Sequence, residues 1–412
     1  MSCPPLSTLA DNSVVRPDRA GSATVSPHPS RRTPTTVNDH RSPAYEPALD
    51  GLRAWAVTAV VLYHASATSR LNVQTGGFIG VSVFFTLSGF LVTRMLLAEH
   101  QANAAIDLRR FWSRRIRRLA PASLTVIALV VLLASREWPG MQPSDAAAGI
   151  WGYTNWHVIA SGEAQLLRTI VGPLGPFWSL AVEEQFYLLL VIAFAIAALT
   201  RRPAATLAAV LSAGWLVSAV VQLAVSSPAY RAEFGTERRM AELLAGCLLA
   251  LALQHRPSIL TTNANAWGLA ALPALAALIG YGIFGSSDPG WLLHGGYVAV
   301  GIVSVVVILG VLSHGHLARL LSVRPIVKVG VMSYSIYLVH WPVVLMIDHH
   351  FAHAGRWPSL ISKVVVSFAA ATALHLLVEQ PLRRARMTPR LTGALWIGTC
   401  LSVTVAAGML LG

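Results

Sequence analysis

Arg53 and His64 have residue types that suit group-transfer chemistry, and they lie in one hydrophobic segment, LDGLRAWAVTAVVLYHA. Their spacing of eleven residues is three helical turns to within about 20°, so both side chains project from one face, roughly 16 Å apart along the axis. A guanidinium at one end of this face can hold an anion, and an imidazole deeper in can act as a general base. Asp50, three residues before Arg53, is placed to pair with it and to help bind the substrate.

A structural interpretation of the same residues is equally compatible with the spacing. Arg53 can extend its guanidinium to lipid headgroups, and His64 can satisfy a hydrogen bond in the core. The spacing by itself leaves the two interpretations even.

A run of six arginines between Arg109 and Arg118, in RRFWSRRIRRLAP, is a second candidate. A guanidinium binds phosphate oxygens through two parallel hydrogen bonds. Arg115 and Arg118, at i and i+3 on a helix that leads into Pro121, are the best-placed pair for this. For most of the six, a signal that sets membrane topology is the simpler interpretation.

Two adjacent carboxylates, Glu183 and Glu184, open the hydrophobic segment FWSLAVEEQFYLLL. Neighbouring residues on a helix point about 100° apart, so at most one of them easily faces an internal cavity. His340 lies beside Pro342 in YSIYLVHWPV, and a residue of this kind is more often structural than catalytic when taken alone. The glycines of GGFIGVSVFFTLSGFL favour close helix packing over a phosphate loop, because no GK[ST] follows them.

The segments that must position these residues are hydrophobic along most of the chain. Apolar residues make up 54% of the 412 and charged residues 12%, about half the charged fraction of a soluble domain. The pattern predicts an all-α, multi-pass membrane bundle of about 10–11 transmembrane helices. The eleven predicted spans are 49–67, 78–98, 119–135, 178–199, 204–225, 240–254, 264–284, 294–313, 326–347, 359–380 and 391–411.

The composition also excludes several classes of protein. A cytosolic or nuclear enzyme cannot build its surface from so few charges, and three cysteines far apart in the chain give neither a disulfide framework nor a CxxC metal site. Residues 1–44 are rich in Pro, Ser, Thr and Arg and have no apolar period, so we expect a disordered cytoplasmic segment there.

The net charge of +13 is explained by membrane topology and gives no indication of a nucleic-acid partner. With the N-terminus in the cytoplasm, most Lys and Arg residues fall in inner connections, and an odd number of spans places Gly412 outside. This count assigns Arg238, Arg239 and Lys363 to the outer side. The lipid bilayer of the cell membrane is the expected environment.

Six blocks occur in an order and spacing that resemble the membrane-bound acyltransferase 3 family. They are Arg53 with His64, GVSVFFTLSGFL, FWSRRIRRLAP, FWSLAVEEQFYLL, SYSIYLVHWP and VEQPLRR. The resemblance covers roughly 45–385, and 386–412 is left as a final transmembrane helix. It implies a helical membrane bundle that moves acyl groups from acyl-CoA to hydroxyls of sugars, surface polysaccharides or antibiotics.

The resemblance also implies roles for residues of this sequence. By position these are His64 as the catalytic imidazole, Arg53 as its partner, Arg115 and Arg118 near the CoA phosphates, and Glu183 or Glu184 and His340 lining the site. One departure is Ser82 in GVSVFF, where many members carry an acidic residue. The chain is expected to lack the fused extracytoplasmic esterase-like domain that some members carry.

Together these observations predict an integral-membrane O-acyltransferase that takes acyl-CoA from the cytoplasm as its donor substrate and needs no metal or other cofactor. A covalent acyl-enzyme is less favoured, because no Ser or Cys lies in a recognisable nucleophile motif. We favour a macrolide or another sugar-bearing secondary metabolite as the acceptor over a large polysaccharide. The alternatives are a transporter that exports an acylated metabolite or glycan precursor, and a structural partner in a cell-envelope complex.

Overall fold

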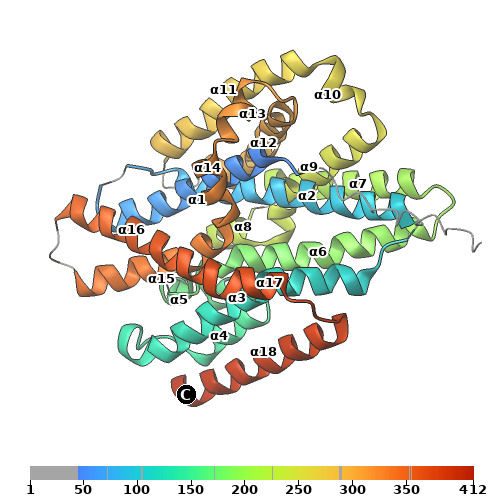
Figure 1. Ribbon diagram of the computed structural model, residues 1–412. Coiled ribbons are helices and arrows are strands. Elements are labelled where there is room, and N and C mark those ends of the chain that lie inside the picture. The colour runs from blue at the N-terminus through green and yellow to red at the C-terminus, as the bar shows by residue number, and fades with distance from the viewer. Residues whose placement is uncertain are drawn as a thin grey trace, which may run out of the picture. The chain divides into compact units, whose positions relative to one another are not determined.

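In the computed structural model the chain forms two compact units, Met1–His40 and Arg41–Gly412. All the described residues belong to the second unit. The described residues are 45–71, 73–103, 105–170 (side chains of 163–169 excepted), 172–224, 226–286, 290–351, 353 and 355–412. The disorder predicted for 1–44 therefore lies outside them. Within the described ranges every regular element is helical, which confirms the all-α class (Figure 1).

Each of the eleven predicted spans falls on one helix or on consecutive helical segments. The corresponding elements are α1 (Pro47–Thr68), α2 (Gly80–Asn103), α3 (Leu108–Glu137), α6 (Phe177–Ala198), α7 (Pro203–Ala224), α9 (Thr236–His255), α11 (Ala264–Phe284), α12 (Gly296–Leu312), α14 (Arg324–Val331) with α15 (Ser333–His350), α16 (Arg356–Leu374) with α17 (Gln380–Arg384), and α18 (Pro389–Leu411). Of the described helices, seven are long and apolar enough to cross a membrane, or eight if α14 and α15, bent by 67°, form one broken span.

Shorter helices fill the connections. These are η1 (Gly77–Ile79), α4 (Pro143–Ile150), α5 (Thr154–Ile170), α8 (Ala229–Phe234), α10 (Ser258–Thr262), η2 (Gly290–His294) and α13 (His316–Leu321). The π-helical turn η3 (His375–Glu379) instead joins α16 to α17 within the span Arg356–Arg384. The long connection between the third and fourth spans thus carries α4 and α5.

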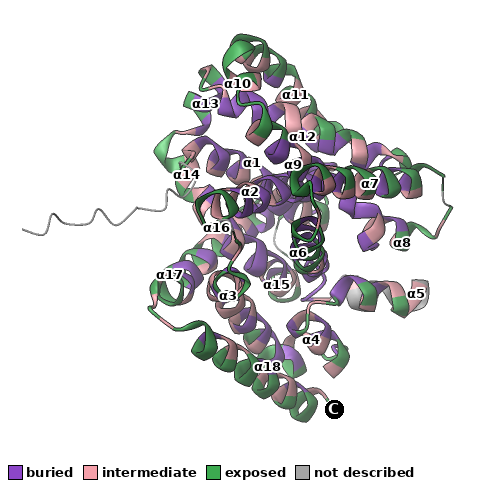
Figure 2. Cartoon of the chain, turned by 90° about the vertical axis from the view of Figure 1, so that its right-hand side faces the viewer, coloured by how far each residue is buried: buried purple, intermediate pink, exposed green. Residues whose placement is uncertain are grey.

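The buried centre of this unit is formed by α1, α2 and α9, which are largely purple in Figure 2. The helices α2 and α9 approach closely because glycines face each other's backbone. A Cβ on Gly89 would lie 1.9 Å from the carbonyl oxygen of Leu243, and one on Gly246 would lie 2.0 Å from that of Thr86. The prediction that Gly89 and its neighbours serve helix packing is therefore confirmed.

The helices at the margins expose apolar side chains instead of burying them. In both views α18 lies beside α3 and α4, with its opposite face uncovered (Figures 1 and 2). That face carries Leu395, Leu401 and Val405, each about half exposed. Such a surface is unfavourable in water and is typical of a helix that contacts lipid tails, so the chain is a multi-pass membrane protein.

The arginine run is helical, as predicted for Arg115 and Arg118, and it forms the first part of the same helix as the third span. Helix α3 begins at Leu108, where the Asp107 side chain caps it by accepting a hydrogen bond from the Arg110 amide at 3.0 Å. Pro121 lies within the helix, one turn before Thr125, whose hydroxyl donates to the Pro121 carbonyl oxygen at 2.7 Å. The arginines therefore have fixed directions around one helix axis.

Three basic residues that we assigned to the outer side are buried within helices, and the side of the membrane on which they lie stays a prediction. Arg238 and Arg239 lie in the first turn of α9 with 2% exposure each. Lys363 is fully buried in α16, where its Nζ contacts Asp348 Oδ1 at 2.5 Å. Ion pairs and hydrogen bonds compensate these charges inside the bundle, which a count of charges along the sequence does not detect.

Candidate active site

A cavity between α1, α2, α3, α6 and α15 brings together four residues that we predicted from distant parts of the sequence. Arg53 of α1, Arg115 and Arg118 of α3, and Glu183 of α6 all line it. The empty space between its lining residues is about 770 Å³, a volume that includes open solvent. The remaining lining is mainly apolar and aromatic: Val81, Phe84, Phe85, Leu87, Ser88, Leu91, Val92, Leu119, Ser179, Leu180, Tyr187, Ser333, Tyr334 and Tyr337.

The charges around this cavity favour an anion. Arg53 Nη1 lies 3.3 Å from Asp50 Oδ1, so the pairing predicted at the start of α1 is present. The other Asp50 oxygen accepts a hydrogen bond from the Tyr45 hydroxyl at 2.8 Å. The lining contains three guanidinium groups and one carboxylate, that of Glu183. The cavity therefore has an excess of positive charge.

Arg115 is held against an aromatic ring instead of in an ion pair. Its guanidinium carbon lies 3.5 Å from the centroid of the Tyr187 ring, a cation–π contact. The Tyr187 hydroxyl donates to Glu183 Oε2 at 3.1 Å, so Ser88 Oγ, 2.5 Å away, is the donor to Tyr187. Among the described residues the buried Nε of Arg115 has no hydrogen-bond acceptor. The orientation is thus fixed while a donor stays available for a ligand.

Only one of the two adjacent glutamates faces the cavity. Glu183 lines it, whereas Glu184 is exposed on another side of α6. The Glu184 carboxylate lies against the turn at Gly152, where an added Cβ would come within 2.4 Å of Oε2. Gly152 has φ +69, a conformation that glycine adopts without strain. A role for Glu184 in the site stays a prediction that this geometry does not favour.

His64 and His340 form a pair outside the cavity lining, although they are 276 residues apart in the chain. Nδ1 of His64 lies 3.0 Å from Nε2 of His340, and the two rings are stacked with centroids 5.1 Å apart. Nδ1 of His340 lies 2.6 Å from the carbonyl oxygen of Tyr337. The ring of Trp341 also packs on His64, at 4.9 Å between centroids.

This hydrogen-bond chain assigns the tautomers of both rings. A carbonyl oxygen only accepts, so Nδ1 of His340 carries a hydrogen, and in the neutral ring its Nε2 is the acceptor. Nδ1 of His64 then donates to it, and Nε2 of His64 retains a lone pair. The arrangement leaves His64 with the nitrogen that a general base requires.

The cavity and the histidine pair share two helices. Along α1, His64 follows Arg53 by eleven residues, roughly 16 Å of helix. Along α15, Tyr337 lines the cavity and its carbonyl oxygen accepts the hydrogen bond from His340. The predicted residues therefore form an arginine-rich cavity and, deeper along the same helices, a histidine pair.

Comparison with known proteins decides the family. The model of the acyltransferase 3 family, described as an acyltransferase domain, matches residues 46–379. The chain belongs to this family. The matched range includes the cavity and the histidine pair, and the resemblance predicted from the six sequence blocks is confirmed. No solved structure matches the chain significantly.

Curated relatives of this acyltransferase 3 chain include proteins named for O-acetyl transfer. The O-acetyltransferase OatA of Staphylococcus aureus (strain NCTC 8325 / PS 47) is 33% identical over 359 residues, 83% of this chain and 58% of the relative. The putative peptidoglycan O-acetyltransferase YrhL of Bacillus subtilis is 34% identical over 82% of this chain and 55% of its own length. The peptidoglycan O-acetyltransferase OatA of Listeria monocytogenes is 32% identical, with 82% and 56% covered. The chain thus spans under three fifths of the length of these relatives.

Sequence reasoning missed a buried ion pair beside the cavity. Arg239 binds Glu242 through its Nε at 2.8 Å and its Nη2 at 3.0 Å, and its guanidinium lies 3.8 Å from the ring centroid of Tyr297. Nη2 also donates to Ser82 Oγ at 3.1 Å. At Ser82 this chain therefore has a hydroxyl on a buried guanidinium, and Glu242 supplies the carboxylate that pairs with it. The spacing of Arg239 and Glu242, at i and i+3, was the available signal.

Proposed function

We propose that this chain is a membrane O-acyltransferase that transfers an acetyl or similar small acyl group from acyl-CoA to a hydroxyl of a glycan. The observation that carries the proposal is the combination of three guanidinium groups around one cavity with the contact of His64 Nδ1 to His340 Nε2 at 3.0 Å. The tautomer assigned from this contact leaves Nε2 of His64 as the proton acceptor. Membership of the acyltransferase family and the names of the relatives support the reaction type.

The cavity would hold the nucleotide end of the donor. Phosphate oxygens bind guanidinium groups through charge-assisted hydrogen bonds, and Arg115 offers an unused Nε. The pantetheine arm of CoA is comparable in extended length to the roughly 16 Å of helix between Arg53 and His64. The thioester would therefore reach the imidazole while the phosphates stay at the arginines.

At the thioester the chain would act by general base catalysis. Nε2 of His64 takes the proton of the acceptor hydroxyl, the acceptor oxygen forms a bond to the carbonyl carbon, and the carbon–sulfur bond breaks. The proton on the imidazolium then passes to the departing thiolate of CoA, which leaves the enzyme as it began. His340 positions the ring, because its Nε2 accepts the Nδ1 hydrogen of His64 and fixes the productive tautomer.

The proposed orientation places the arginines at the cytoplasmic side, where acyl-CoA is available. The N-terminus lies in the cytoplasm in this arrangement, and α1, α3 and α15 all run from the arginine end toward the outer face. The burial of Arg238, Arg239 and Lys363 is compatible with it, since those residues no longer add positive charge to outer connections.

The acceptor is proposed from chemistry and from the relatives. Two of the relatives carry peptidoglycan in their names, which favours a glycan hydroxyl. A macrolide or another sugar-bearing metabolite stays a prediction of the sequence analysis. Both acceptor types carry sugar hydroxyls, so a direct comparison between them is needed.

The test is acyl transfer by the purified full chain in detergent micelles, with radiolabelled acetyl-CoA and a panel of acceptors. The panel contains soluble peptidoglycan fragments, a macrolide and, as a control for thioester hydrolysis, buffer alone. We expect acceptor-dependent label transfer, greatest with the glycan. Micelles have no gradient, so product formation there excludes the transporter alternative, whereas label released at the same rate with and without every acceptor would contradict the proposal.

A further inference from the structure

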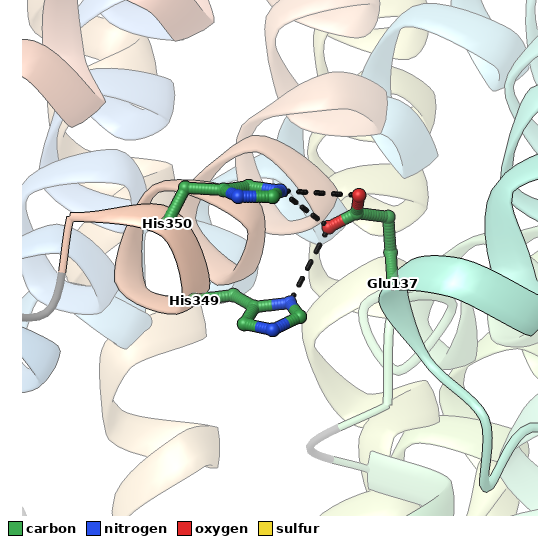
Figure 3. A group of neighbouring side chains, drawn as sticks. All are labelled: Glu137, His349 and His350. Carbon is green, nitrogen blue, oxygen red and sulfur yellow. Dashed lines mark hydrogen bonds and ion pairs between the residues drawn. The ribbon is translucent and has the colours of Figure 1, made fainter.

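Two histidines and a glutamate meet at the C-terminal ends of α3 and α15 (Figure 3). Nε2 of His350 lies 2.9 Å from Oε2 of Glu137 and 3.1 Å from Oε1. Nδ1 of His349 lies 3.4 Å from the same Oε2. In Figure 3 both imidazole rings point toward the carboxylate, and one ligand atom from each of the three residues lies within 4.8 Å of the other two.

Neither of the two histidines that contact Glu137 carries a permanent positive charge. The side chain of Glu137 is 5% exposed, while those of His349 and His350 are 56% and 48% exposed. An imidazole is mostly neutral at pH 7, and a carboxylate removed from water is costly unless a positive charge compensates it. A divalent cation between the three side chains would supply that charge and would remain accessible from solvent.

We propose that Glu137, His349 and His350 form a binding site for a divalent transition-metal ion, with Zn²⁺ as the best fit. Imidazole nitrogen and carboxylate oxygen are ligands that Zn²⁺ prefers, and two histidines with one glutamate leave a fourth position for water. Hard cations such as Mg²⁺ bind oxygen ligands in preference to imidazole, which argues against them here.

One of the two distances between ligand atoms already fits a tetrahedral ion. Bonds of about 2.0–2.2 Å to nitrogen and oxygen place tetrahedral ligand atoms about 3.3–3.5 Å apart. The separation between His349 Nδ1 and Glu137 Oε2 is 3.4 Å, and that between His350 Nε2 and the same oxygen is 2.9 Å. Small rotations of the two exposed rings would complete the geometry without movement of the helices.

The site would fasten two helices that matter for the active site. Glu137 ends α3, whose first half carries Arg115 and Arg118, and His350 ends α15, ten residues or about 15 Å beyond His340. A bound ion would hold these helix ends together. The site contains none of the residues that line the cavity, so the proposal does not depend on the proposed function.

Zinc binding can be measured on the purified full chain, carrying an affinity tag without histidines and stripped of metal with a chelator. Titration against a colorimetric zinc indicator should show one tightly bound Zn²⁺ per chain. The double variant His349→Ala with His350→Ala should lose this site, and Glu137→Gln should weaken it at least about tenfold. His353→Ala is the matched control, because it removes an exposed histidine nearby that is outside the group, and it should bind as the wild type does.

Equal zinc binding by the wild type and the double variant would overturn the proposal, as would the absence of a tight site in the wild type. A second measurement needs no variant. X-ray absorption at the zinc edge of the loaded wild type should show two imidazole nitrogens among ligands at about 2.0–2.2 Å, and a shell of oxygens without imidazole would refute the assignment.

Discussion

Replacement of His340 by phenylalanine tests the hydrogen bond that orients the general base. The phenylalanine ring keeps the stacking on His64 and removes both nitrogens. His340 is completely buried, so His64 Nδ1 then has no acceptor at the position that Nε2 of His340 occupies, 3.0 Å away. Without that acceptor, no hydrogen bond favours the His64 tautomer with its hydrogen on Nδ1. In the other tautomer the hydrogen is on Nε2, and Nε2 cannot accept the hydroxyl proton.

The size of the effect follows from that one hydrogen bond. A buried donor left without an acceptor costs about 1–3 kcal/mol, and each 1.4 kcal/mol is a factor of ten. Turnover by His340→Phe should therefore fall by about 5- to 140-fold. Most of this range lies below the two to four decades expected when His64 itself is replaced by alanine.

The assay is initial-rate transfer from labelled acetyl-CoA in micelles, normalised to folded protein by size-exclusion chromatography. His157→Phe is the matched control, because it also removes a histidine hydrogen bond, that of Nε2 with Asp145 at 2.8 Å, away from the cavity. The control should stay within about twofold of the wild type. In a His64→Ala background, His340→Phe should cause no further loss, since the two residues act as a unit.

Two results would refute this reasoning. The first is His340→Phe protein that keeps more than half of the wild-type turnover. The second is a double variant whose loss equals the product of the two single losses, because independent effects contradict a role of His340 that acts through His64.

Four further predictions concern the cavity, the packing and the orientation. Arg115→Lys should raise the KM for acyl-CoA about tenfold or more despite the retained charge, because lysine lacks the planar donor pair, and an unchanged KM would leave the arginine as a topology signal. Glu183→Gln should lower turnover more than Glu184→Gln, since only Glu183 lines the cavity and anchors Tyr187; equal losses would contradict the geometry. Gly246→Val should destabilise the fold by about 1–3 kcal/mol through overpacking, measured by thermal unfolding in detergent. Gly140→Cys, in a variant without the native cysteines, should react with an impermeant thiol reagent from outside intact cells, and protection there would reverse the orientation.

The helices could be predicted because their signal is local. An apolar stretch of about 20 residues predicts a span wherever it packs, so all eleven predicted spans fall on helices. The predicted ends of the spans differ from the helix ends where charged residues are buried inside the bundle. Arg239 lies just before the predicted span 240–254. The carboxylate of Glu242, three residues later, pairs with its guanidinium, so Arg239 is buried within the helix.

The site could be predicted only in part. Helical spacing placed Arg53 and His64 on one helix at the right separation, and it implied that Glu183 and Glu184 diverge without deciding which faces inward. The pairing of His64 with His340 depends on tertiary packing across 276 residues, and no periodicity encodes it. The family resemblance could identify both histidines, whereas only the folded structure shows that they are in contact.

The most direct test of the account is the turnover of His64→Ala beside the wild type, with labelled acetyl-CoA and a glycan acceptor in detergent micelles. The account predicts a loss of roughly two to four decades while the variant inserts and purifies as the wild type does. A His64→Ala protein that keeps more than a tenth of the wild-type turnover would contradict the assignment of the general base.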